Sequence, residues 1–265
     1  MTTHTSRASW RSALWGCLFG SCLATLIWAP SQWLAWVINE TTQGRLQWHN
    51  MRGTVWTGSA QWSLGEGHGH PSAQVLPGRV AWTLKPMWAG MQINIHAPCC
   101  TSQPFQVQAT LTDWSSWRIH IQDHTSTWPT AMLSGLGAPW NTLQLSGKLN
   151  LKTHGLQLHW LQGRAQFKGN AQLEVENLSS RLSPINPMGS YRLLLVGSTQ
   201  GAPSPTLVLS TQQGPLLLSG QGQWAGTRLR FEGEASAQEE HEASFQYLLN
   251  LLGRRQGARS LISLG

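Results

Sequence analysis

Acidic residues are scarce in this chain of 265 residues, which contains two aspartates and nine glutamates. A pair of carboxylates in one cleft is a common arrangement for general acid–base catalysis. Five of the glutamates instead lie close together near the C-terminus, at Glu232, Glu234, Glu239, Glu240 and Glu242, as is typical of a solvated charged face. The sequence also lacks a nucleophile elbow, a phosphate-binding glycine loop ending in Lys-Ser or Lys-Thr, and a His-Glu-x-x-His motif. We therefore expect no catalytic residues and no cofactor, and a protein that is not an enzyme.

Runs of basic residues are absent as well. The formal net charge is +7, but no segment has five or more consecutive lysines and arginines, and the bases are spread singly apart from Arg254 and Arg255. Scattered positive charge suits anionic lipid headgroups or an acidic protein face better than the continuous patch that DNA binding needs. We expect no nucleic-acid partner.

Cysteine is rare, with four residues in the chain. Cys17 and Cys22 lie five residues apart in an apolar stretch, where a helix would direct them to different faces, so we interpret them as small apolar fillers. Cys99 and Cys100 are adjacent, and the ~3.8 Å between neighbouring Cα atoms is less than the usual ~4.4 Å minimum of a disulfide. A strained vicinal disulfide and a turn with free or intermolecular thiols both remain open.

Two groups of histidines could supply metal ligands. One consists of His68 and His70, and the other of His120 and His124 with Asp123 between them. Neither group has an evident further partner, and no second cysteine pair is available for a zinc site. We expect no metal site.

Residues 12–39 contain no charged side chain. A helix needs about 20 residues to cross a bilayer, and we predict a transmembrane anchor over residues 12–38. Arg7 and Arg11 precede it, so the positive-inside rule puts residues 1–11 in the cytoplasm and residues 39–265 in the periplasm. The apolar anchor residues are Ala13, Leu14, Leu18, Phe19, Leu23, Leu26, Ile27 and Trp28.

A cleaved signal peptide is the alternative interpretation, because it also combines a basic start with an apolar middle. Bulky residues occupy the place where small residues would mark the cleavage site, namely Trp28, Trp33, Leu34 and Trp36. This favours an anchor that is retained.

Beyond residue 40, apolar and polar residues alternate over short segments that are separated by glycines. Such alternation predicts strands with one buried face, and a series of them joined by glycine turns predicts an antiparallel meander. The clearest segments are 79–84, 91–96, 105–111, 143–151, 156–160, 165–167, 171–178, 191–196, 206–210, 215–224 and 228–233. Residues 114–140 are less regular. No stretch has the strand–helix alternation of a parallel sheet.

One helix is predicted in the soluble part. Phe245, Leu248, Leu249 and Leu252 recur at the spacing of one helix face. Ser236 with Glu239 forms a capping-box pattern before this stripe, and Gly253 can end the helix. We interpret it as a C-terminal helix packed on the sheet.

Tryptophan is abundant, with 16 residues. Trp56, Trp62, Trp82 and Trp160 fall in alternating strands, where filling a thin core is the default role. An exposed subset that forms a partner surface or stacks on carbohydrate or peptide is the alternative.

The order of these features resembles the type II secretion system protein N family. An N-terminal apolar helix precedes a glycine- and tryptophan-marked strand, and a leucine-rich helix near the C-terminus runs into residues 253–255. The residues that carry the likeness between these helices are Gly53, Thr54, Trp56, Gly58, Trp82, Gly189, Tyr191, Gly214, Pro215, Gly220, Gly222, Phe231 and Gly233.

The resemblance implies a mainly β fold, in which one N-terminal transmembrane helix is followed by an antiparallel, curved meander sheet with a short C-terminal helix. It implies a non-enzymatic accessory component of the inner-membrane platform. Such a component would contact other platform subunits, the secretin and inner-membrane lipids, and would support export of folded exoproteins across the outer membrane. The pattern is also similar to AsmA-like proteins, so a periplasmic lipid-binding or lipid-conducting sheet is the alternative.

Overall fold

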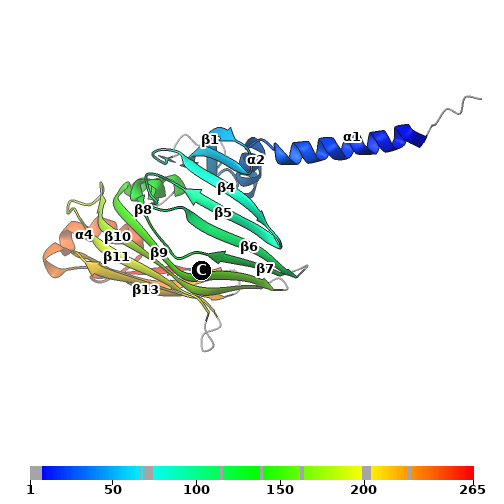
Figure 1. The fold of residues 1–265 in the computed structure, drawn as a ribbon. Helices are drawn as coiled ribbons and strands as arrows, with labels where there is room; N and C mark the ends of the chain where they lie inside the picture. The colour runs from blue at the N-terminus through cyan, green and yellow to red at the C-terminus, as the bar shows by residue number, and fades with distance from the viewer. Residues whose placement is uncertain are drawn as a thin grey trace, which may run out of the picture.

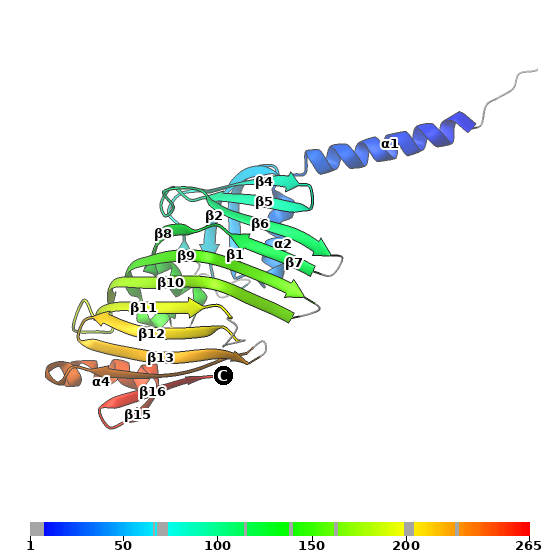
Figure 2. The same cartoon turned by 60° about the horizontal axis from the view of Figure 1, so that its bottom comes forward.

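The protein is built on one 16-stranded antiparallel sheet, seen in a computed structural model that describes residues 8–65, 67, 74–113, 116–137, 140–161, 164–198, 204–225 and 228–265. Along the sheet the strands follow the order β1-β2-β4-β5-β6-β7-β9-β10-β11-β12-β13-β14-β16-β15, with β3 beside β2 and β8 beside β9. Figures 1 and 2 show these strands stacked nearly in chain order. The predicted antiparallel meander is confirmed.

The strands have the following bounds: β1 (Leu46–Gly53), β2 (Thr57–Leu64), β3 (Gln74–Val75), β4 (Val80–Met87), β5 (Gly90–His96), β6 (Phe105–Asp113), β7 (Ser116–Ile121), β8 (His124–Pro129), β9 (Leu145–Leu161), β10 (Arg164–Ser180), β11 (Gly189–Val196), β12 (Thr206–Gln213), β13 (Leu216–Ala225), β14 (Arg228–Ala237), β15 (Arg254–Gln256) and β16 (Arg259–Leu264). The helices are α1 (Ala8–Ile27), α2 (Gln32–Thr41), α3 (Trp140–Leu143) and α4 (Glu242–Leu252), with 3-10 turns η1 (Thr130–Leu136) and η2 (Glu239–His241).

Register places apolar residues opposite one another across many strands. Val107 of β6 lies opposite Ile93 of β5 and Ile121 of β7, and Leu173 of β10 lies opposite Leu151 and Leu193. Because side chains alternate between the faces of a strand, this register produces one apolar face and one polar face over the sheet.

The two longest strands differ from what the sequence predicts. The segments 143–151, from residue 145 on, and 156–160 belong to one strand, β9, and the segments 165–167 and 171–178 belong to another, β10. Each of these two strands has 17 residues. Where the sequence pattern predicts a break in each strand, the paired strands β9 and β10 instead continue through a β-bulge. Gly155 and Gly169 have positive φ values of 58° and 85° there, which glycine adopts at low cost.

The sheet has two unlike ends. β1, β4, β6, β9, β11 and β13 all run toward one end, which we call the hairpin end. At the opposite end, which we call the capped end, η1, α3 and α4 lie against the sheet (Figures 1 and 2).

The core is concentrated at the capped end. One cluster joins Phe245, Leu248 and Leu249 of α4 to apolar residues of the sheet and its connections, namely Leu143, Leu145, Met188, Leu216 and Ala235. A second cluster contains Leu76, Val80, Ala97 and Cys100. Met132 packs against the second cluster and Leu133 against the first, so η1 links the two. In the middle of the apolar face, by contrast, residues such as Ile93, Leu158 and Leu193 are only half-buried.

The predicted C-terminal helix is confirmed, but the predicted start at Ser236 is wrong. Ser236 belongs to strand β14, and α4 follows the short turn η2 with no side-chain cap at His241. Phe245, Leu248 and Leu249 are buried as the apolar stripe predicts. The pairing of β14 with β16 holds Ser236 in the sheet, so it is not available as a helix cap.

The N-terminal anchor also needs correction. The expected helix over residues 12–38 is two helices, α1 and α2, with a break at residues 28–31. Pro30 lies in the break and forms a bridge with Thr54; proline has no N–H to continue a helix. Within the described part of the chain, no helix combines the length and the hydropathy needed to cross a membrane.

Candidate interaction surface

The turn between β1 and β2 joins the N-terminal helices to the sheet. The indole N–H of Trp56 donates to the carbonyl oxygen of Leu26 at 2.9 Å, and the backbone N–H of Val55 donates to that of Ala29 at 2.9 Å. Thr54 accepts a hydrogen bond from the Thr57 N–H through its hydroxyl. Gly53 has φ of +91°, and a side chain there would collide with the Thr57 carbonyl. Three of the residues that carry the family likeness, Gly53, Thr54 and Trp56, therefore meet in this joint.

A tryptophan cluster supports this joint from the sheet. The ring of Trp48 lies 5.3 Å from that of Trp62 and 5.0 Å from that of Trp82. Trp82 donates its indole N–H to the carbonyl oxygen of Val55 at 3.0 Å, and its ring covers Gly58, where a Cβ atom would collide with it. The core role predicted for Trp82 is confirmed, since it is only 3% exposed.

A second group of the likeness residues meets at the capped end. The hydroxyl of Tyr191 donates to the carbonyl oxygen of Leu216 at 3.1 Å, and burial raises the pKa of this hydroxyl far above its usual value. Gly189 lies so close to Tyr191 that a Cβ atom would be 2.8 Å from the hydroxyl oxygen. Gly214, with φ of +122°, abuts the backbone of Gly189 and precedes Pro215 in the turn to β13.

The third group lies on β13 and β14. Gly220 pairs with Gly233 and Gly222 pairs with Phe231. The ring of Phe231 covers the places where side chains of Gly220, Gly222 and Gly233 would stand. An aromatic ring thus replaces the side chains that these glycines lack. All these groups have structural roles.

The polar face carries a ladder of charges across β9, β10 and β11. Glu174 accepts hydrogen bonds from Lys152 at 3.0 Å and from Arg192 at 3.1 Å. The bond from Lys152 is the main cause that lowers the pKa of Glu174. This ladder ties three neighbouring strands together on a partly exposed face.

The histidine groups do not assemble. His68 and His70 lie outside the described residues. His120 lines a hollow of about 210 Å³ with Gln106, Gln108 and Gln122, whereas His124 packs edge-on against Phe105. In the described ranges, no group of three or more His, Cys, Asp or Glu side chains could hold a metal ion.

Asp123 has a different role from metal binding. It lies between β7 and β8, which together run along β9. One oxygen of Asp123 accepts the Gly155 N–H at 2.7 Å, and the other lies 2.7 Å from the His154 ring. The hydrogen bond from Gly155 is the main cause that lowers the pKa of Asp123. Its carboxylate therefore holds the junction of β7 and β8 against the bulge in β9.

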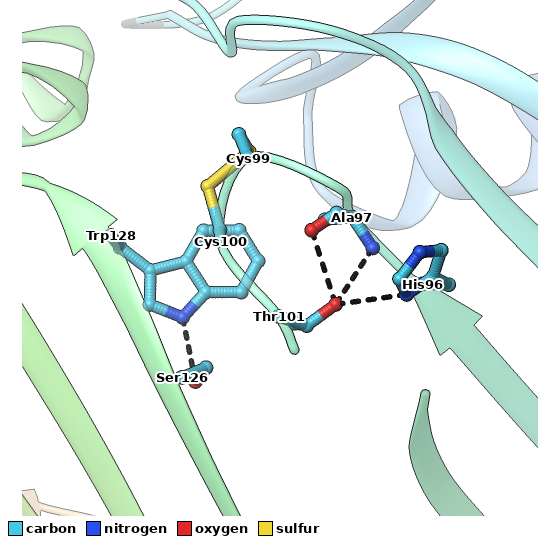
Figure 3. Close-up of a disulfide and its surroundings, with 7 residues drawn as sticks. All are labelled: His96, Ala97, Cys99, Cys100, Thr101, Ser126 and Trp128. Atoms are coloured by element: carbon cyan, nitrogen blue, oxygen red, sulfur yellow. Dashed lines mark hydrogen bonds between the residues drawn. A yellow bond between two sulfur atoms is a disulfide. The ribbon is translucent and has the colours of Figure 1, made fainter. Parts of the chain in front are cut away.

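Cys99 and Cys100 form a vicinal disulfide, shown in Figure 3. The turn that contains it is held by the Thr101 hydroxyl, which donates to the Ala97 carbonyl at 3.1 Å and accepts the Ala97 N–H at 2.9 Å. Cys100 is buried in the second core cluster near Trp128. Of the two alternatives that the sequence leaves open, the structure shows the disulfide.

A group of apolar side chains at the hairpin end is exposed, whereas the sequence favoured core positions for its tryptophans and left an exposed subset as the alternative. Trp160 is 46% exposed although its strand pattern predicts a core position, and it lies opposite Trp117, which is 48% exposed. Trp117 in turn lies opposite Leu111, next to the exposed turn between β4 and β5. We call this group the aromatic rim, and it consists of Met87, Trp88, Leu111, Trp117 and Trp160. In the sequence, the one feature that could have indicated this exposure was the position of each residue at or near the end of a predicted strand.

The apolar side chains of α1 are exposed around its whole circumference. They include the large predicted anchor residues Leu14, Leu18, Phe19, Leu23, Leu26 and Ile27, and Ala13 is exposed with them. Trp28, just after the helix, is exposed as well. A helix that is apolar on all sides is normally buried in a protein core or a membrane. In both views, α1 points away from the sheet (Figures 1 and 2).

Fold and surface together define a class: an open single-sheet β protein with structural clusters inside and apolar contact surfaces outside. Comparison with protein families identifies which one. The family described as type II secretion system (T2SS), protein N, matches residues 44–261, and the chain belongs to this family. Membership makes it a component of type II secretion, and hence of protein transport. No curated protein and no solved structure matches the chain.

The match covers the sheet from just before β1 into β16, and it leaves α1 and α2 outside. It contains all the glycines and aromatic residues that carried the likeness in the sequence. The alternative of an AsmA-like lipid-binding or lipid-conducting protein gains no support from these comparisons.

Proposed function

We propose that this protein is a non-enzymatic accessory component of the type II secretion platform in the inner membrane. The observation that carries the proposal is the family match over residues 44–261, which spans nearly the whole sheet. In this role the sheet lies in the periplasm and the N-terminus in the cytoplasm. Its partners are other platform subunits and the secretin, and it supports export of folded exoproteins across the outer membrane.

The geometry supports a scaffold role in two ways. The hydrogen bonds of Trp56 and Val55 join the end of α1 and the break before α2 to the sheet. Exposure of the apolar surface of α1 to water is unfavourable, and a lipid bilayer would bury it. We infer that α1 and α2 hold the sheet at the inner membrane, close to the other subunits.

The test is a secretion assay with an altered N-terminus. Residues 1–39 are replaced by a cleavable signal peptide, so that the sheet reaches the periplasm without its helices. We expect the sheet to fold, as the circular dichroism spectrum of the purified variant would show, and the secreted exoproteins to stay in the periplasm instead of reaching the culture medium. The full-length chain, expressed at the same level, is the control.

Normal secretion by the variant without residues 1–39 would mean that the helices serve only for delivery. Normal secretion after complete deletion of the chain would contradict the proposed function as a whole. Adjacency of the gene to those for a secretin, an assembly ATPase and pseudopilins is expected as an independent check.

A further inference from the structure

The aromatic rim and α1 lie at the same end of the molecule. The break between α1 and α2 is bonded to the β1–β2 turn at Val55 and Trp56. This turn is at the hairpin end, as is the β4–β5 turn with Trp88. Both views show α1 leaving the molecule on the side where β4, β6 and β9 end (Figures 1 and 2). Any surface that α1 enters is therefore within reach of the rim.

The composition of the rim fits one kind of surface. Trp88 is fully exposed, at 105%, and Trp117 and Trp160 are about half exposed. Contiguous exposed apolar residues mark an interaction site, and tryptophan in particular is enriched at the boundary between lipid tails and headgroups. The indole body enters the apolar layer while its N–H stays near water.

The charges around the rim point to the same partner. Five exposed basic residues lie within two residues of a strand end at the hairpin end, and these are Arg52, Lys85, Arg118, Arg228 and Arg230. Asp113 is the one acidic residue among the described residues in the same positions. At the capped end the exposed charges are mixed, with Arg45, Arg181 and Arg259 beside strand ends and Glu239 and Glu240 in η2. Basic residues at the same end of a sheet as an aromatic patch attract anionic lipid headgroups.

We propose that the aromatic rim lies in the headgroup region of the same lipid bilayer that α1 contacts, so that the sheet stands with its hairpin end on the membrane. This inference rests on the membrane location in the proposed function. The apolar rim supplies burial in the interface, and the basic residues along the same end of the sheet supply attraction to anionic lipid. The capped end then points away from the membrane, toward partners in the periplasm.

The experiment places an environment-sensitive dye at single cysteines of the full-length chain in vesicles. Ala89→Cys labels the β4–β5 turn beside Trp88, and Ala243→Cys labels an exposed alanine of α4 at the capped end. Cys17 and Cys22 are replaced by alanine in both variants, and the Cys99–Cys100 disulfide is left intact. In a third protein Cys22 is the one free cysteine, and the dye attached to it reports on α1. The vesicles contain phosphatidylethanolamine, phosphatidylglycerol and a lipid with a nitroxide quencher on its acyl chain.

The expected result is a loss of fluorescence at residues 22 and 89, and none at residue 243. In vesicles with phosphatidylcholine in place of phosphatidylglycerol, the loss at residue 89 should become smaller, because the basic residues lose their anionic partner. An equal loss in both vesicles would overturn the role given to the basic residues.

The outcomes separate the two proposals. Quenching at residue 22 with none at residue 89 would overturn the rim inference while leaving the membrane location intact, and the rim would then face water or a protein. No quenching at residue 22 would contradict the membrane location itself. Equal quenching at residues 89 and 243 would show that the sheet has no preferred end toward the lipid.

Discussion

Aromatic rings lie over glycines at two places that are far apart in the chain. Trp82 covers Gly58 near the N-terminal helices, and Phe231 covers Gly220 in the C-terminal hairpin. In both, a glycine removes a side chain from one strand and its neighbour supplies a ring that fills the space. This pairing explains why glycine and aromatic residues occur together in the segments that resemble the family.

A substitution at Gly58 tests this packing. A Cβ atom there would collide with the Trp82 ring and lie 2.7 Å from the Arg52 carbonyl oxygen. We expect Gly58→Ala to lower the free energy of unfolding by about 1–3 kcal/mol through overpacking, as measured by urea denaturation. The control is Gly20→Ala, because no atom lies within 4 Å of a Cβ atom at that position. Equal stability of the Gly58 variant and the unaltered protein would contradict the packing role.

His124 should make the stability of the sheet dependent on pH. Its Nε2 atom is buried without a hydrogen-bond partner in the described chain, and burial lowers the pKa of its ring below the ordinary value of about 6.5. A lowered folded-state pKa means that the unfolded chain binds more protons, so this contribution is present above about pH 6.5 and is lost as the pH falls.

We expect His124→Leu to remove part of that loss. The measurement is the free energy of unfolding at pH 7.5 and at several values below pH 6.5, for both proteins. Part of the pH dependence should remain, since burial also lowers the pKa of His159. The positive charges of Arg118 and Lys168 lower it further. An identical pH dependence in the two proteins would show that His124 does not contribute.

Helix α4 is the element that closes one end of the apolar face. It presents Phe245, Leu248 and Leu249 to the sheet, and the carbonyl oxygen of Leu249 accepts a hydrogen bond from the Ser260 hydroxyl at 2.7 Å. Without α4, Leu216 and Ala235 of the sheet would be exposed to water. The helix is therefore part of the core and not an appendage.

The contribution of α4 can be measured with two leucines of the same helix. Leu249 is fully buried, whereas Leu251 is 42% exposed. We expect Leu249→Ala to lower the free energy of unfolding by about 2–5 kcal/mol, because it leaves a cavity in the cluster. Leu251→Ala should cost much less. Similar losses for the two variants would mean that α4 does not pack as described.

At the scale of the whole molecule, the two ends of the sheet have different surroundings. The capped end is covered by η1, α3 and α4, while the hairpin end exposes the aromatic rim and is joined to α1. In the proposed location, residues 1–11 are cytoplasmic and the sheet is periplasmic. The difference between the ends then becomes a direction relative to the membrane.

This orientation predicts the result of protease treatment. Protease added to intact spheroplasts should remove the sheet, because it lies on the outer side of the inner membrane. A tag fused to the N-terminus should stay protected until the membrane is permeabilised with detergent. The fragments are followed by immunoblotting for the tag and for the sheet. Protection of the sheet in intact spheroplasts would contradict the orientation.

The sequence by itself determined the type and approximate position of most elements. Alternation between polar and apolar residues is a property of neighbouring residues, so it predicted the antiparallel sheet, and the leucine spacing predicted the buried face of α4. The order of glycines and aromatic residues was enough to indicate the family that the comparison then showed over residues 44–261.

Only the tertiary structure decided the features that depend on partners far away in the chain. Gly155 and Gly169 bend β9 and β10 without ending them, because the strands remain paired on both sides of the bulge. Pro30 breaks the N-terminal helix where the β1–β2 turn can bond to it. Trp160 is exposed because of its place at the hairpin end, although its local pattern equals that of the buried Trp82. Alternation assigns a side chain to a face of the sheet, but which part of that face is covered depends on how the distant helices pack.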